Sequence, residues 1–122
     1  MNQVNEMPLA ESVQLGLEVI RALSQTAEAC LLFVQNEGHD PEMVHVALHA
    51  SDRAEHVAQY FLEAPDKIWP LDSALDDVAW LLEIGRVTAR VRLKVVRDIP
   101  TLEDLETLSG RIRASLAVVD KT

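Results

Sequence analysis

Three histidines and one aspartate recur at three- and four-residue spacing in the middle of this 122-residue chain. The four side chains are His45, His49, Asp52 and His56. Side chains at that spacing share one face of a helix, where imidazole and carboxylate groups are able to ligate one metal ion. The apolar residues of the segment project to its other side, however, and metal sites in helical bundles are built inward. We therefore interpret the row as a solvated polar face, with a metal site and a pH-sensitive interface contact as the alternatives.

An arginine, a histidine and a tyrosine on the same segment form a second candidate site. Arg53 and His56 lie close to Tyr60 in the sequence, an arrangement that would suit a helical, nuclease-like small enzyme. Such a trio arises readily by chance on a polar helix face, so this interpretation stays an alternative. The chain carries no glycine-rich phosphate loop, no nucleophile elbow and no paired cysteines. We accordingly predict a non-enzymatic protein without a cofactor.

Four cations fall on one edge of a predicted helix near the C-terminal third of the chain. They are Arg86, Arg90, Lys94 and Arg97. Their spacing allows them to act together on an anion such as a phosphate. The interpretation that we favour is structural, because they are able to pair with acids on neighbouring helices, such as Glu103 and Glu106. Aromatic residues that would stack on nucleic-acid bases are absent near the cations.

The net charge of −9 is unevenly distributed along the chain. Residues 1–85 hold fifteen acidic and three basic side chains, whereas residues 86–122 hold five acidic and eight basic ones. A chain this acidic is repelled by a polyanion over most of its surface, so we do not expect nucleic acid as a partner. The acidity also permits a rival interpretation, an acidic inhibitor that mimics nucleic acid, although solubility explains it equally well.

Length and composition predict one soluble, helical domain over residues 1–122. Nearly half of the residues are apolar, and these are mainly aliphatic with few aromatics, which favours helices over sheets. The single cysteine, Cys30, excludes an internal disulfide and favours a reducing, cytoplasmic location. No apolar stretch approaches the roughly 20 residues that span a bilayer, and the N-terminus lacks a signal-peptide pattern. We expect residues 1–7 to form a flexible tail.

Start and stop signals divide the chain into four predicted helices, over residues 8–35, 41–63, 72–97 and 101–119. Asp40 and Pro41 predict an N-cap and a first helical position, and Thr101 with Asp104 resembles a capping box. Short connections make sequential helices antiparallel neighbours. We therefore predict an all-α, antiparallel four-helix bundle made of two αα-hairpins.

Two of the predicted helices carry two apolar lines each rather than one. Residues 8–35 and 70–97 echo each other's pattern at an offset of 62, which allows an internal duplication without requiring one. In a bundle of four helices the second line should face water, because each helix has neighbours on one side only. Exposed apolar surface of this extent is typical of a protein–protein interface. The predicted interface residues are Leu15, Val19, Phe33, Trp80, Ile84, Val87, Val91 and Val95.

Together these features predict a small interaction or regulatory protein. It would self-associate, most simply as a two-fold homodimer, or bind another protein through the apolar faces of residues 8–35 and 72–97. The competing explanation is that these two helices are central in a single chain, with both apolar lines covered by neighbouring helices. The two explanations differ in one observable, which is the burial of the second lines within one copy of the chain.

Overall fold

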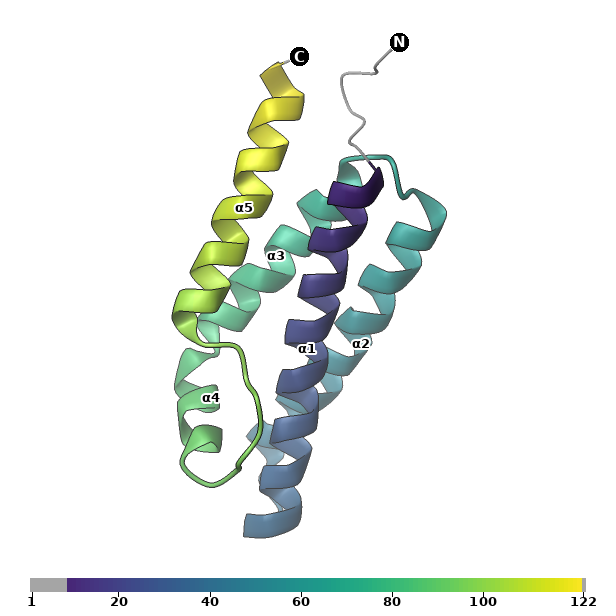
Figure 1. Ribbon diagram of the computed structural model, residues 1–122. Coiled ribbons are helices and arrows are strands. Elements are labelled where there is room, and N and C mark those ends of the chain that lie inside the picture. The colour runs from purple at the N-terminus through teal and green to yellow at the C-terminus, as the bar shows by residue number, and fades with distance from the viewer. Residues whose placement is uncertain (1–8, 122) are drawn as a thin grey trace.

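The computed structural model describes residues 9–121, and the elements of this range are five helices (Figure 1). They are α1 (Leu9–Glu37), α2 (Pro41–Glu63), α3 (Trp69–Glu83), α4 (Gly85–Arg92) and α5 (Leu102–Lys121). The predicted all-α class is confirmed. The tail predicted over residues 1–7 lies outside the described residues. Among the helices of the described range, none combines the length and the apolar character that a bilayer-crossing segment requires.

The turn between α1 and α2 forms as its residues predict. Gly38 takes a φ of 102°, a conformation that glycine adopts without steric cost, and its N–H donates to the Val34 carbonyl. The Asp40 carboxylate then accepts a hydrogen bond from the Met43 N–H at 3.2 Å, and Pro41 occupies the first turn of α2. The predicted N-cap at Asp40 is therefore confirmed.

The start of α5 is fixed by a reciprocal pair of hydrogen bonds. The Asp104 N–H donates to the Thr101 hydroxyl at 3.0 Å, and the Thr101 N–H donates to the Asp104 carboxylate at 3.1 Å. These two bonds satisfy backbone donors that the first helical turn leaves without a partner. The predicted capping box is confirmed, with aspartate in the place that glutamate usually takes.

The predicted helix over residues 72–97 is replaced by α3 and α4, and residues 93–97 lie in the connection to α5 because α4 ends at Arg92. Ile84 leaves helical geometry with a ψ of 17°, and Gly85 begins the second helix directly after it. A Cβ atom at Gly85 would lie 3.0 Å from a methyl group of Leu102, so the glycine allows the start of α5 to approach closely. The predicted four-helix arrangement is not confirmed, because this segment forms two helices.

The helices are arranged around α1, which contacts each of the other four (Figure 1). α2 runs antiparallel to α1 along most of its length, and α5 packs mainly on α3. The buried apolar residues form two clusters. One joins the first part of α1 to α2, α3 and α5, and the other joins the end of α1 to the start of α2, to α4 and to residues 95–99.

Candidate functional site

The second apolar line of α1 is buried within the chain, not exposed as predicted. Leu15 and Val19 belong to the first core cluster and Phe33 to the second, and all three are buried. The reason is that α1 is central and has neighbours on both flanks: α2 covers one flank, and α3, α4 and α5 cover the other. The competing explanation from the sequence is therefore the correct one for this helix.

The second line of the third predicted helix is also covered, and the break at Ile84 explains how. Val87, Val91 and Val95 are buried in the second core cluster, whereas Trp80 and Ile84 are half-buried where the two clusters meet. Before the break, Leu71 and Val78 of the first line are buried and Leu75 and Leu82 are half-buried, whereas after it Leu93 and Val96 of the same line face solvent. The buried surface of this segment therefore follows the first line before Gly85 and the second line after it. Val87, Val91 and Val95 do not present the free apolar face that was predicted, and Trp80 and Ile84 are exposed only in part.

The histidine row is largely solvent-exposed, as His45, His49 and Asp52 are exposed and His56 is half-buried, but its middle part adjoins α3. The His49 ring meets the Trp80 ring edge-on at 4.4 Å, and His45 stacks on His49 at 6.4 Å. Nδ1 of His56 lies 2.8 Å from the backbone carbonyl of Asp52 in the preceding turn. Within the described residues no three His, Cys, Asp or Glu side chains gather in a group suited to a metal ion.

Two residues of the candidate nuclease-like trio, Arg53 and Tyr60, make contacts that connect α2 to α3. Arg53 donates two hydrogen bonds to Asp77, at 2.7 and 3.2 Å, and Asp77 is buried. The Asp77 hydrogen bond raises the pKa of the Arg53 guanidinium, whose planar group also lies over the Tyr60 ring. Tyr60 in turn meets Trp69 edge-on at 5.1 Å. Arg53 is thereby committed to a structural ion pair.

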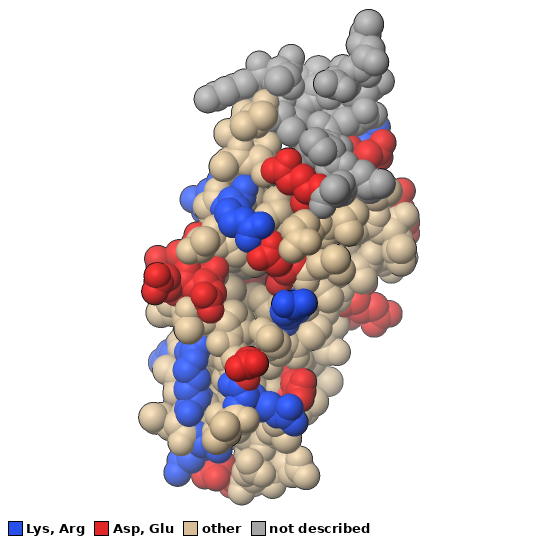
Figure 2. All heavy atoms as spheres, viewed as in Figure 1, with Lys and Arg blue, Asp and Glu red and all other residues tan. Residues whose placement is uncertain are grey.

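The four cations of the candidate anion site are each paired with an acid. Arg86 and Arg90 contact Glu42 at 3.0 Å, and Arg90 also contacts Asp40 at 2.9 Å. Lys94 lies 3.7 Å from Glu37, and Arg97 lies 3.3 Å from Glu28. The pairing was predicted, but its partners lie on α1 and at the start of α2 instead of at Glu103 and Glu106. Figure 2 shows Lys and Arg side chains in blue over the region of α4, with Asp and Glu side chains in red nearby.

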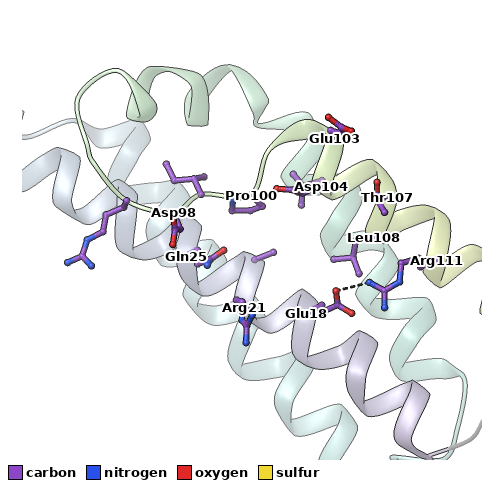
Figure 3. Close-up of a pocket in the computed structure, with 14 residues that line it drawn as sticks. Glu18, Arg21, Gln25, Asp98, Pro100, Glu103, Asp104, Thr107, Leu108 and Arg111 are labelled. Carbon is purple, nitrogen blue, oxygen red and sulfur yellow. Dashed lines mark hydrogen bonds and ion pairs between the residues drawn. The ribbon is translucent and has the colours of Figure 1, made fainter.

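A groove of about 610 Å³ lies between α1, residues 97–100 and α5 (Figure 3). Glu18 and Arg111 meet across it at 2.7 Å, a contact that raises the pKa of the Arg111 guanidinium. Its lining mixes cations such as Arg21 with acids such as Asp98. Opposite charges alternate along the groove, so its side chains do not converge on one kind of ligand.

Four exposed leucines lie on the outer side of α1 and α2. Leu17 and Leu31 on α1 are 55% and 53% exposed, and Leu48 and Leu62 on α2 are 65% and 83% exposed. At about 100° per residue, Leu17 and Leu31 lie roughly 160° around α1 from the buried line of Leu15. We call these four residues the outer leucine face. Sequence reasoning missed it, although the same 14-residue spacing recurs in both helices.

The exposed leucines of α2 point away from α3. The opposite flank of α2 carries Arg53 and Tyr60, which contact residues of α3 and its start. Leu48 and Leu62 lie roughly 120° to 180° around the helix from these residues. The two pairs of leucines therefore line the same outer side of the α1–α2 hairpin.

The unusual titratable groups of the described region have structural causes. Burial raises the pKa of the Cys30 thiol to about 11, and the hydrogen bond from Met43, followed by that from Arg90, lowers the pKa of Asp40. Neither group lies on the outer leucine face. Comparisons of this chain with protein-family models, with curated proteins and with solved structures found no match.

Proposed function

We propose that this chain is a small, non-enzymatic interaction or regulatory protein that binds a protein partner through the outer leucine face. The observation that carries the proposal is the exposure of Leu17, Leu31, Leu48 and Leu62 on one side of one helical hairpin. The class of function is the one that the sequence predicts. The surface is different, since α2 replaces the third predicted helix.

The energetics support a docking role for this surface. Covering each leucine in a complex would contribute roughly 1–2 kcal/mol, because each side chain is half to four-fifths exposed. Isolated exposed leucines are normal on protein surfaces, but these four form two pairs across adjacent helices, Leu17 with Leu62 and Leu31 with Leu48, and paired apolar side chains suit an interaction site. Exposed charges lie beside the leucines: Arg21 and Glu28 on α1, and Asp52 and Glu55 on α2, project within about 40° of Leu17 or Leu48.

A cytoplasmic location is part of the same proposal. Cys30 is a buried free thiol that fills space in the second core cluster. A chain with one buried thiol is suited to a reducing compartment, where disulfides are rare.

Site-specific photo-crosslinking in the native host tests the proposal. A benzophenone amino acid would replace Leu48 or Leu62, and in control proteins Val118 or Leu93. The controls match in exposure, since Val118 is 65% and Leu93 is 82% exposed. The proposal predicts discrete protein adducts from the two face positions and not from the controls. No adduct at Leu48 or Leu62, or the same adducts from all four positions, would contradict it.

A further inference from the structure

We infer that the occupant of the outer leucine face is a second copy of this chain, placed on it by a two-fold axis. The inference rests on the proposed function and names its partner. It follows from the arrangement of the four leucines and from the area that they outline.

The four leucines mark the corners of a rectangle. Gly16 faces the Phe61 ring, with a Cβ position 2.7 Å from it, so Leu17 and Leu62 lie at the same level of the antiparallel hairpin. Leu31 and Leu48 each lie 14 residues further from that level, which corresponds to about 21 Å along each helix. Packed helices are about 8–10 Å apart, and this spacing sets the short side of the rectangle.

A rectangle of this kind is complementary to itself. A two-fold axis parallel to the helices places α1 over α2 of the other copy, so that Leu17 meets Leu62 and Leu31 meets Leu48. An axis across the helices places α1 over α1, so that Leu17 meets Leu31 and Leu48 meets Leu62. Both rotations bring leucine onto leucine at every corner, as an isologous interface requires. A self-complementary interface requires the same 14-residue spacing in both helices, whereas binding to an unrelated protein does not.

The area agrees with a small, specific dimer. Each helix with its side chains is about 10–12 Å across, so the face is about 20 Å wide and, over α1 from Val13 to Val34, about 30 Å long. The resulting footprint of about 600 Å² per copy is near the lower end of specific interfaces, which average about 800 Å² per partner.

The charges predict how salt affects the association. Each copy carries a net charge of −9, so two copies repel each other at long range. The leucine side chains that would make the contact carry no charge, and salt screens the repulsion between the two copies. Dimerisation should therefore strengthen as sodium chloride rises from 50 to 500 mM, whereas an association driven by opposite charges would weaken.

Sedimentation velocity of the purified full-length chain over a concentration series tests the inference. Wild type is compared with the double variant Leu48→Glu/Leu62→Glu and with the control Leu93→Glu/Val118→Glu, which has the same net charge and matched exposure. We expect a dimer for wild type and the control, and a loss of affinity of at least about 30-fold for each face leucine replaced. A second variant, Leu17→Ser/Leu31→Ser, removes the α1 leucines without adding charge, and circular dichroism verifies that every variant is folded.

A wild-type monomer at all concentrations would overturn the inference, as would a dimer that both face variants leave intact. If the wild type is a monomer but crosslinking at Leu48 captures a different polypeptide, the second-copy inference fails and the proposed function stands. If the wild type is a monomer and Leu48 forms no adduct, both fail.

Discussion

At the scale of single residues, the side chains that invite a catalytic interpretation serve as structural contacts. Arg53 binds Asp77, and His49 packs on Trp80, so two members of the polar face of α2 hold α3 in place. Arg86 and Arg90 bind acids at the start of α2. What a charged residue contacts across the fold depends on tertiary packing, which explains why the sequence indicated pairing but named the wrong acids.

The Arg53–Asp77 pair gives the first prediction. Replacing Asp77 with alanine leaves a mostly buried guanidinium without its partner, because the Arg53 side chain is 22% exposed. We expect the free energy of unfolding to fall by about 2–4 kcal/mol in urea titrations. The adjacent Asp76 is exposed and is the matched control, for which alanine should change stability by less than about 0.5 kcal/mol. Equal effects of the two substitutions would show that the ion pair does not stabilise the fold.

At the scale of helices, local sequence signals were sufficient to predict helix ends but not the break between α3 and α4. Asp40, Gly38 and the Thr101–Asp104 capping box were readable because a cap is formed by residues within a few positions of each other. The break at Ile84 involves one residue, and its main sequence signal, Gly85, is ambiguous because isolated glycines such as Gly16 and Gly110 are tolerated inside helices. Because the break was not predicted, the buried residues before and after it were read as two apolar lines on one continuous helix. The second line was then predicted, incorrectly, to be an exposed interface.

The Asp40 cap gives a prediction about pH. Hydrogen bonds from Met43 and Arg90 lower the pKa of its carboxyl below the ordinary 3.8. The charged form therefore stabilises the fold at pH values above the unfolded pKa, and this contribution is lost as the pH falls through the folded pKa. Asparagine at this position keeps a capping oxygen but no charge. Asp40→Asn should unfold at lower urea than wild type at pH 7, with the difference vanishing near pH 2.

A control for that experiment is Asp66→Asn, since Asp66 is exposed and lies in the connection between α2 and α3. Its unfolding midpoint should follow that of the wild type at both pH values. A difference between Asp40→Asn and wild type that persists undiminished at pH 2 would mean that the carboxylate charge is not its cause.

Two helical glycines give a matched pair of predictions. A methyl group at Gly16 would lie 2.7 Å from the Phe61 ring, whereas nothing lies within 4 Å of one at Gly110. Gly16→Ala should therefore lower the free energy of unfolding by about 1–3 kcal/mol through overpacking between α1 and α2. Gly110→Ala should raise it by about 0.5–1 kcal/mol, because alanine favours the helix. If thermal unfolding shows that both substitutions stabilise, α1 and α2 are not in close contact at this level.

At the scale of the whole molecule, the sequence indicated that one face of the protein is apolar and uncovered, but not which face. Leu31, Leu48 and Leu62 follow apolar periodicity as well as the core residues do, so pattern alone could not separate them from the core. Their exposure depends on α3, α4 and α5 all lying on the inner side of the α1–α2 hairpin. Whether these leucines are buried can therefore be decided only from the tertiary structure.

Distances between spin labels test the central claim most directly. Ser24 is exposed on α1 between Leu17 and Leu31, and burial raises the pKa of the Cys30 thiol to about 11, so labelling at neutral pH selects an introduced Ser24→Cys. Since packed helices lie about 8–10 Å apart, two copies joined through the outer leucine face should give electron–electron distances below about 25 Å. Labels at Glu106→Cys on α5, away from this face, should give longer ones. Absence of any distance between labels at Ser24, or a shorter distance at Glu106 than at Ser24, would contradict the account.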